Sequence, residues 1–377
     1  MASARPAALL APLSMGGLAL KNRIALAPMT RGRSTAQPNC VPEPVMETYY
    51  EQRSNAGLVI TEATGVNLQG LGWYCAPGIW SEEQTKAWTR IVDAVHKTGS
   101  VISLQLWHMG RAGHPDVTGI DTVAPSPVAL GGDVTTVNGV KKPHVVPKEM
   151  DEAAIKALIE DYRVAAVNAK TAGFDFVELH AANGYLLDTF LQTKSNQRTD
   201  AYGGSLENRL RLVKEVLQCL ITVFPCNRVG IRYSPNGAFQ EMGSPDNVES
   251  FTEAIKLAGS LGLGYIHVMD GLGFGFHKLC DPFTLEMARA ILTGIEAAKD
   301  TKLIGNAGYT KEAAEEQVAA GHGDMIAFGR PYISTPDLVY RFEHGLELNE
   351  DAPHNLWWAP GLGAKGYTDW PTYSEKK

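Results

Sequence analysis

The chain has no run of like charge, no paired cysteine motif and no long apolar segment. Its 34 Lys and Arg residues against 41 Asp and Glu residues give a net charge of −7 at pH 7. Proteins that bind nucleic acid or anionic membranes concentrate basic residues in a patch, and this sequence has no such cluster. A membrane-spanning helix needs about 20 consecutive apolar residues, and no stretch reaches that length. We therefore expect neither a nucleic-acid nor a membrane partner.

Cysteine is scarce and unpaired. There are five cysteines, and none forms a Cys-x-x-Cys pair. An odd number of scattered thiols is typical of a reducing compartment and argues against a disulfide or zinc framework. The apolar start of the chain, residues 6–20, is interrupted by Pro12 and by Gly16 and Gly17. That pattern favours a β-hairpin over a secretory signal, so we expect a cytoplasmic protein.

The sequence does contain a regular alternation of short apolar runs with longer segments of helical period. The apolar runs predict eight strands, at 24–29, 58–64, 101–108, 174–180, 229–234, 265–270, 303–306 and 325–329. This alternation favours an α/β fold in which residues 1–377 form one (β/α)8 TIM barrel, with a doubly wound sheet as the alternative. The long gap after the third strand predicts a loop-and-hairpin insertion, at about 109–150, over one barrel mouth.

The doubly wound alternative would require Gly-x-Gly-x-x-Gly between a strand and a helix. The match at Gly361 to Gly366 has no predicted strand before it and no helix after it, so we interpret these glycines as loop residues. Two helices have clear beginnings. Ser81 and Gln84 form a capping-box pattern, and Ser205 precedes apolar residues spaced three or four apart.

In a TIM barrel, catalytic groups lie at the carboxyl ends of the strands. Strand alternation puts Gln105 on the same face as Trp107, and His180 on the same face as Glu178. Gly230 lies two residues before Arg232, so we expect space in the barrel for this long cation. The polar and aromatic residues at predicted strand ends are Thr30, Gln105, Trp107, His108, His180, Asn183, Tyr185, Arg232, Asp270, Asn306 and Arg330.

The last two strands end in residues that suit a phosphate group. Gly305 and Gly308 flank the end of the seventh strand, and Gly329 and Arg330 follow the eighth. Glycines expose backbone N–H groups, an arginine pairs with phosphate through two hydrogen bonds, and barrels often bind phosphate in these two loops. The alternative is a plain turn that carries a solvated arginine.

His180, Asn183 and Tyr185 form the densest polar cluster. If the chain turns helically after the strand, His180 and Asn183 face the same side and can donate to one oxygen. Two neutral donors on one oxygen would polarise a carbonyl, and Tyr185 would supply a weak acid beside it. The alternative is a buried structural histidine with a packed tyrosine.

Nine short motifs follow one another along the chain: Leu18-Ala-Leu-Lys-Asn-Arg23, Ala27-Pro-Met-Thr-Arg31, Leu104-Gln-Leu-Trp-His108, Ala124-Pro-Ser-Pro127, His180-Ala-Ala-Asn-Gly-Tyr-Leu186, Arg198 to Arg209, Gly230-Ile-Arg-Tyr-Ser-Pro235, Phe328-Gly-Arg-Pro331 and Gly366-Tyr-Thr-Asp369. In this order they resemble the Old Yellow Enzyme family of flavin-dependent ene reductases, which includes plant oxophytodienoate reductases. The resemblance covers nearly the whole chain.

The resemblance implies a tightly bound, non-covalent FMN. It places Thr30 at the O4 edge of the flavin ring, Gln105 at its pyrimidine, and Arg232 at the N1/C2 carbonyl region, where a cation raises the flavin potential. The flavin ring would be surrounded by Pro28, Thr30, Ala63, Gln105 and Arg232. The phosphate would be held by Asn306, Ala307, Gly329 and Arg330.

The resemblance also implies a ping-pong reaction driven by NADPH, which would use the substrate's own slot. An enone, enal or nitroalkene, with oxylipins among the candidates, would be held through its oxygen by His180 and Asn183. Tyr185 would protonate the α carbon after hydride reaches the β carbon. Pocket walls would come from Trp107, Trp73 and Phe274, and the protein would act as a monomer or homodimer. The family's aromatic residue before the C-terminal glycine turn is replaced here by Pro360, with Trp357 and Trp358 just upstream.

Two other functions compete with an ene reductase. A metal-dependent barrel hydrolase or lyase would use His108, His180, His267 and Asp270, although strand phase places His108 opposite Gln105. A non-catalytic flavoprotein would hold FMN without turning over NADPH and an activated alkene.

Overall fold

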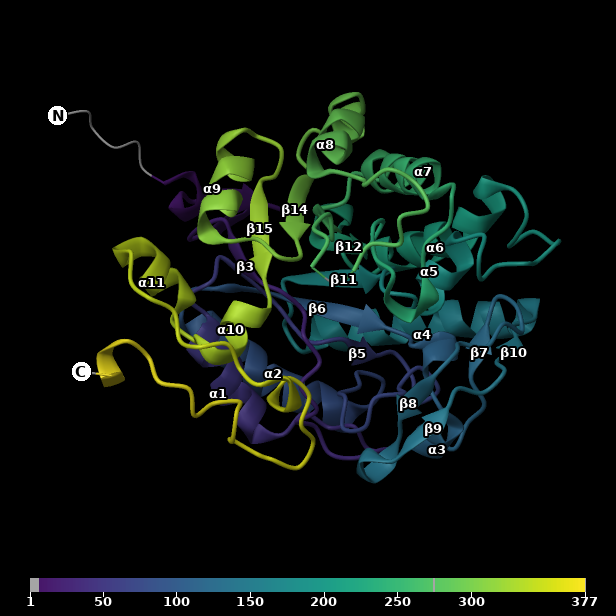
Figure 1. Cartoon of the computed structure of the whole chain (residues 1–377), viewed down its shortest axis with the longest axis horizontal. Helices are drawn as coiled ribbons and strands as arrows, with labels where there is room; N and C mark the ends of the chain where they lie inside the picture. The colour runs from purple at the N-terminus through teal and green to yellow at the C-terminus, as the bar shows by residue number, and fades with distance from the viewer. Residues whose placement is uncertain (1–6, 274, 377) are drawn as a thin grey trace.

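Eight parallel strands close into a barrel in the computed structural model, which describes residues 7–273 and 275–376 (Figure 1). Each strand pairs in parallel with the next, and the last returns to the first with Phe328 opposite Leu26. The predicted TIM barrel is therefore confirmed, and the doubly wound alternative is wrong. The barrel strands are β3 (Ile24–Leu26), β4 (Leu58–Ile60), β6 (Val101–Trp107), β11 (Phe176–His180), β12 (Val229–Tyr233), β13 (Tyr265–Val268), β14 (Lys302–Asn306) and β15 (Met325–Phe328).

Helices connect the strands and surround the barrel. The predicted capping box begins α2, because Ser81 Oγ accepts the Gln84 N–H at 3.2 Å and Gln84 Oε1 accepts the Ser81 N–H at 3.0 Å. Ser205 caps α6 through a single bond, in which its Oγ accepts the Asn208 N–H at 3.3 Å. The long helices are α1 (Pro44–Arg53), α2 (Glu82–Lys97), α4 (Glu152–Thr171), α6 (Leu206–Ile221), α7 (Asn247–Ser260), α8 (Leu285–Thr293), α9 (Lys311–Ala319) and α11 (Leu338–His344). The short helices are α3 (Pro115–Thr118), α5 (Leu186–Leu191) and α10 (Arg330–Ser334).

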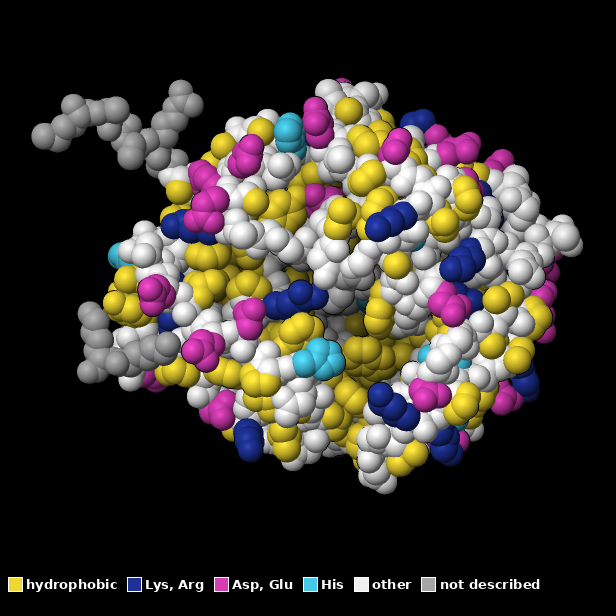
Figure 2. Space-filling view, viewed as in Figure 1, with side chains coloured by type: hydrophobic (Ala, Val, Ile, Leu, Met, Phe, Trp, Pro, Cys, Tyr) yellow, Lys and Arg dark blue, Asp and Glu magenta, His cyan; other side chains and the backbone are white. Residues whose placement is uncertain are grey.

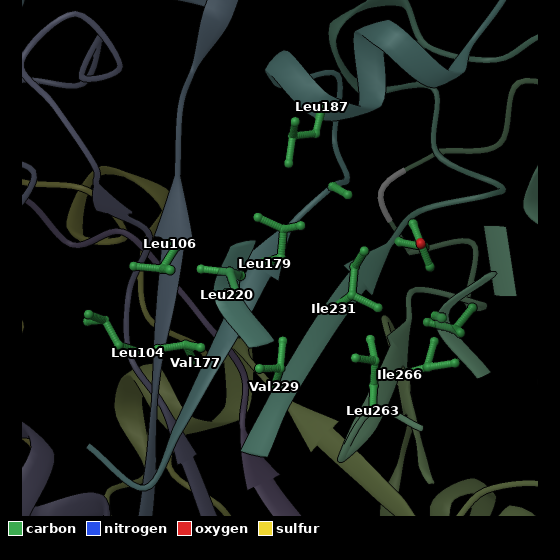
Figure 3. Packing of buried hydrophobic residues seen from close by; sticks show 14 of the residues in the cluster. Leu104, Leu106, Val177, Leu179, Leu187, Leu220, Val229, Ile231, Leu263 and Ile266 are labelled. Carbon is green, nitrogen blue, oxygen red and sulfur yellow. The ribbon is translucent and has the colours of Figure 1, made fainter. Parts of the chain in front are cut away.

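Alternation along the strands separates two kinds of buried residue. Leu106, Leu179 and Ile231 lie side by side on the outer face of neighbouring strands, where they pack in the apolar core beneath the helices (Figure 3). Gln105 directly precedes Leu106, and Glu178 directly precedes Leu179. Both side chains therefore point to the other face, inside the barrel, where they meet. At this level of the barrel, the strands therefore bury apolar residues outward and polar residues inward.

The amino-terminal end of the barrel is closed by the predicted hairpin. Strands β1 (Leu13–Met15) and β2 (Leu18–Leu20) pair antiparallel, and Met15 packs in one apolar cluster with Phe176 and Tyr265 from the first residues of β11 and β13. Gly16 has φ +56° and its backbone approaches Asn227 so closely that a Cβ would lie 2.4 Å from the Asn227 carbonyl oxygen. The hairpin is confirmed, and it covers the end of the barrel opposite the strands' carboxyl ends.

The segment after β6 forms small sheets of its own. Strands β8 (Asp133–Thr135) and β9 (Lys141–Pro143) make an antiparallel hairpin, and β7 (Val123–Ala124) pairs in parallel with β10 (Lys148–Glu149). These elements lie beyond the carboxyl end of β6 (Figure 1). The hairpin expected within 109–150 is present at this position.

Several strands end earlier than predicted. β3 ends at Leu26 rather than at residue 29, because Pro28 has no N–H to donate to a neighbouring strand. The predicted strand 58–64 is split into β4 and the short β5 (Thr64–Gly65). The residues that leave the sheet in this way, including Pro28 and Thr30, line the cavity described below.

None of the described helices combines the length and apolarity that crossing a membrane requires.

The C-terminal segment crosses the end of the barrel at which the strands have their carboxyl ends, and two buried arginines hold it there. Arg31 donates to the carbonyl oxygens of Trp357 and Gly366 at 2.6 and 2.9 Å, and Arg33 donates to that of Gly363 at 2.8 Å. The glycines from 361 to 366 lie in turns after no strand, so their interpretation as loop residues is confirmed.

Candidate active site

A cavity of about 1160 Å³ opens at the carboxyl ends of the barrel strands. Figure 2 shows it as a hollow near the centre of the visible face, lined largely by hydrophobic side chains with basic side chains at its edge. Its walls come from the ends of β3, β12, β14 and β15, from the β8–β9 hairpin and from the C-terminal segment. The sequence-predicted residues that line it are Pro28, Thr30, Trp73, Asn183, Arg232, Asn306, Ala307, Gly329 and Arg330.

The remaining predicted residues lie behind this wall. Trp107 and Tyr185 share an apolar cluster with Met109 and Ala112, which line the cavity, and Ala63 belongs to the same cluster. The Tyr185 ring meets Trp107 and His180 edge to face, each with ring centroids 5.0 Å apart. Gln105 is buried deeper, inside the barrel. Phe274 lies outside the described residues.

The turn after β11 brings the polar cluster together, but it is not helical. Asn183 and Gly184 both adopt left-handed backbone conformations, with φ +60° and +71°, and α5 begins only at Leu186. The Asn183 N–H donates to Ser234 Oγ at 2.7 Å and the Gly184 N–H to Asp188 Oδ2 at 2.8 Å. A helical turn was expected here; the structure instead has a left-handed turn stabilised by side chains.

Burial sets the protonation of this cluster. Burial, with smaller effects of Arg232 and His267, lowers the pKa of His180 well below its usual range, so the imidazole is neutral at pH 7. Burial raises the pKa of Tyr185, although Arg232 and a hydrogen bond from Gln240 oppose this, so the phenol keeps its proton. The cluster therefore offers a neutral imidazole and a protonated phenol close to the cavity wall.

Arg232 is a buried cation whose position is fixed by Asn306. Its Nη2 donates to Asn306 Oδ1 at 2.7 Å, and Asn306 Nδ2 donates to the Ala327 carbonyl at 2.7 Å. Burial lowers the pKa of Arg232 to about 10, which still leaves it charged at neutral pH. Both residues were predicted to lie at strand ends, but no sequence pattern indicates this contact between them.

Beneath Arg232 lies a carboxylate to which the sequence analysis gave no role. Glu178 is fully buried, and its carboxylate accepts from Gln105 Nε2 at 2.7 Å and contacts His267 Nδ1 at 3.0 Å. A charged residue on the inward face of an otherwise apolar strand is the signal that could have found it. The space above Gly230, which we expected Arg232 to need, is occupied by the Tyr265 ring instead, 2.3 Å from where a Cβ would lie.

Several buried polar atoms near the cavity have no hydrogen-bond partner among the residues that the structure describes, and Trp107 Nε1, His180 Nδ1 and Arg232 Nε are three of them. They belong to β6, β11 and β12, which are neighbours in the barrel. Buried polar groups in proteins are normally satisfied, so an arrangement of this kind favours a ligand that carries oxygen and nitrogen atoms. A flat heteroaromatic ring with carbonyl groups fits this set of donors.

The far side of the cavity suits the other end of such a ligand. Ala307 and Gly308 have left-handed backbone conformations, with φ +86° and +90°, and Gly329 precedes α10. The Arg330 guanidinium lies over the Trp357 ring at 5.1 Å and donates to the Gly273 carbonyl at 3.1 Å. Gly308, Gly329 and Arg330 are among the residues from which the sequence predicted a phosphate site, and the resemblance added Ala307.

The metal-dependent alternative finds no support in this geometry. Within residues 7–273 and 275–376, no three His, Cys, Asp or Glu side chains are placed to share a metal ion. His267, one of the proposed ligands, is instead bound to Glu178.

Fold and site together define a TIM barrel with a large cavity at the carboxyl ends of its strands. The profile of the NADH:flavin oxidoreductase / NADH oxidase family matches residues 8–349. The chain belongs to this family, the Old Yellow Enzyme family of flavin oxidoreductases that act on small molecules.

Similar proteins extend over nearly the whole chain. Chanoclavine-I aldehyde reductase fgaOx3 of Penicillium roqueforti is 38% identical over 97% of this chain and 97% of its own length. The structure of the Old Yellow Enzyme homologue from Zymomonas mobilis superposes with a TM-score of 0.89 at 40% identity, over 97% of this chain and 99% of that chain. Morphinone reductase in complex with tetrahydroNAD superposes with a TM-score of 0.87 at 36% identity, over 97% of each chain.

Proposed function

We propose that this protein is an FMN-dependent ene reductase that uses NADPH to reduce activated alkenes such as enones, enals and nitroalkenes. The observation that carries the proposal is the set of three buried, unpartnered polar atoms of Trp107, His180 and Arg232 on adjacent strands. A flavin ring offers carbonyl oxygens and ring nitrogens to such donors, whereas an empty barrel would leave their desolvation uncompensated.

The residues around the cavity suit FMN at both ends. Pro28, Thr30 and Arg232 line the cavity, and with the buried Ala63 and Gln105 they would hold the ring. Asn306, Ala307, Gly329 and Arg330 would hold the phosphate. When bound, FMN supplies the hydride chemistry, taking hydride from NADPH and giving it to the β carbon of the alkene.

His180 and Asn183 would bind the substrate's carbonyl oxygen. The imidazole is neutral because burial lowers its pKa, so it donates a hydrogen bond without carrying a charge. Negative charge develops on that oxygen as hydride reaches the β carbon, and two donors fixed in place stabilise it in a site sheltered from water. Gly184 fixes the position of Asn183 through its hydrogen bond to Asp188.

Tyr185 would deliver the proton to the α carbon. It is buried, keeps its proton because burial raises its pKa, and is hydrogen-bonded by Gln240 from the loop after the neighbouring strand β12. The tilted rings of Trp73 and Trp358, 5.6 Å apart, narrow the cavity from the other side and help to exclude water. NADPH would enter the same slot before the substrate, which explains why the chain needs no separate dinucleotide motif.

The test begins with the purified protein. We expect it to be yellow, to lose its colour with NADPH in the absence of oxygen, and to regain it with cyclohexenone while the saturated ketone forms. A colourless protein that cannot take up FMN would overturn the proposal. A yellow protein that is reoxidised by no enone, enal or nitroalkene would be the non-catalytic flavoprotein instead.

A second test addresses the carbonyl site. Replacing His180 and Asn183 together with alanine should weaken the binding of a phenol, whose oxygen resembles that of the enolate, in protein matched for flavin content. Titration of the flavin absorbance with phenol measures this. His96→Ala, on the outer surface of α2, is the matched control and should bind phenol as the parent does.

A further inference from the structure

Glu178 is a buried charged group that the proposed reaction does not use. Its side chain has no exposed surface, and it lies on β11 two residues before His180 and on the same face of the strand. An unpaired buried carboxylate is strongly destabilising, so its presence in the middle of the barrel requires a physical reason.

Side chains from two other barrel strands, β6 and β13, converge on this carboxylate. Gln105 of β6 donates to Oε1 at 2.7 Å, and His267 of β13 contacts Oε2 at 3.0 Å. Tyr265, two residues before His267 and bonded to Ser103 at 2.8 Å, also interacts with it. The register explains the first contact, because Glu178 is directly opposite Gln105 in the parallel pair of β11 and β6.

The charge on this group is balanced by Arg232. Burial by itself raises the pKa of Glu178, but His267, Arg232 and Gln105 together outweigh this effect and bring the pKa below its usual range. Burial lowers the pKa of His267 and Arg232 adds to that effect, which together outweigh the opposing effect of Glu178, so the imidazole is neutral and donates its Nδ1–H. The barrel interior therefore holds an anion, Glu178, and a cation, Arg232. The neutral imidazole of His267 contacts the anion.

We propose that Glu178 is a positioning residue that lowers the reduction potential of the bound flavin, by offsetting the charge of Arg232 and by fixing the amide of Gln105. The inference rests on the proposed function, because it takes Arg232 and Gln105 to be the residues next to the flavin ring. Glu178 itself touches neither cofactor nor substrate.

The electrostatic part follows from the charge balance of flavin reduction. Two electrons and one proton are added, so the reduced ring carries one more negative charge than the oxidised ring. A nearby cation favours that state and a nearby anion opposes it. Arg232 alone would raise the potential, and Glu178 limits the rise, which keeps hydride transfer from the reduced flavin to an alkene favourable.

The orienting part follows from hydrogen-bond chemistry. An ionised carboxylate only accepts hydrogen bonds, so Gln105 must turn its nitrogen toward Glu178. Its oxygen is then left for a donor on the other side, and a flavin pyrimidine has an N–H to offer. A neutral amide in place of the carboxylate would allow either orientation of Gln105.

The experiment is Glu178→Gln in the flavin-loaded protein, with the midpoint potential measured by spectroelectrochemistry. The substitution keeps the shape and removes the charge. We expect the equilibrium constant for reduction to rise roughly tenfold, which corresponds to ~30 mV for a two-electron couple. Glu178→Asp, which keeps the charge, should restore most of the parent potential. A potential that does not rise in Glu178→Gln would overturn the proposal.

Two further variants distinguish an electrostatic effect on the flavin potential from a general loss of stability. Ser103→Ala removes the nearby bond to Tyr265 without changing any charge, so it should lower stability and leave the potential unchanged. If Glu178→Gln does not fold, the double variant with Arg232→Gln, whose interior is uncharged, is compared with Arg232→Gln alone, and the same rise is expected. A parent protein without flavin would refute the proposed function, whereas a flavin-loaded variant with an unchanged potential refutes only the role of Glu178.

Discussion

The two ends of the barrel interior are built from the same strands but serve different purposes. At the amino-terminal end, Phe176 and Tyr265 pack against the β1–β2 hairpin in an apolar cluster, and the Tyr265 hydroxyl is satisfied by Ser103. At the carboxyl end the same strand β11 continues to Glu178 and His180. Within five residues one strand passes from apolar packing to buried polar groups, some of which lack partners.

This difference separates stability from function within one core. Apolar side chains at the amino-terminal end, such as Phe176, contribute by packing, so their loss removes buried area and leaves a cavity. Polar groups at the carboxyl end are costly to desolvate, and Trp107, His180 and Arg232 keep an unpartnered atom there. A protein tolerates this desolvation cost where a ligand offsets it. The carboxyl end of the barrel is therefore the end at which we place the function, and we call it the functional end.

The largest expected effect concerns the functional end. We predict that Tyr185→Phe slows reoxidation of the flavin by an enone by about 10²- to 10⁴-fold, because the proton donor is lost, while reduction by NADPH stays largely intact. Stopped-flow absorbance measures the two steps separately. Tyr340→Phe, at an exposed tyrosine on α11, is the control and should change neither. Equal losses in both steps would show that Tyr185 has a structural role.

The next effect concerns the packed end. Phe176→Ala removes a buried ring that meets Tyr265 at 5.9 Å and lies under Arg228 at 5.2 Å. We expect it to lower the free energy of unfolding by ~3–5 kcal/mol in urea titrations. Phe176→Leu, which keeps most of the volume, should cost less than half of that. Turnover per folded molecule should stay near that of the parent, and a large drop would mean that the two ends are not separable.

The smallest effect tests the cost of a buried carboxylate near the functional end. Glu62 is buried, and burial raises its pKa from 4.5 to about 7, although the Arg31 N–H and Tyr50 oppose this. Because the folded pKa is above the unfolded one, stability is greatest at low pH and is lost as pH rises through 7. We expect a loss of about 1 kcal/mol between pH 6 and pH 8, out of about 3 kcal/mol in all.

Glu62→Gln should remove this part of the pH dependence, since an amide does not titrate. Urea unfolding of the parent and the variant at pH 6 and pH 8 measures the difference. A variant that loses as much stability between these two pH values as the parent does would assign the dependence to other groups.

The fold was predictable because its signal is local. The alternation that places Leu179 outward and Glu178 inward depends only on residues that are close in sequence. The same is true of the helix caps at Ser81 and Ser205. Strand ends were predicted too long, because pairing stops where Pro28 offers no N–H and where residues turn to line the cavity. Such ends depend on the neighbouring strand rather than on the segment itself.

The site was predictable in its membership but not in its contacts. A parallel barrel gathers the carboxyl ends of its strands, so His180, Arg232 and Asn306 could be grouped from their positions alone. Their partners could not: Glu178 meets Gln105 across 73 residues and His267 across 89, and Asn306 meets Arg232 across 74. Gln240, which reaches Tyr185 from the loop after β12, followed no sequence pattern at all.

The sequence by itself determined that the chain forms a barrel, which residues stand at its strand ends and, through its motifs, which family it resembles. Only the tertiary structure decided how those residues act on one another: that His180 is neutral, that Asn306 holds Arg232, and that Glu178 shares the interior with a cation. The reason is physical. Periodicity and turns are set by neighbours along the chain, whereas burial, charge balance and hydrogen-bond partners are set by segments that meet only when the barrel closes.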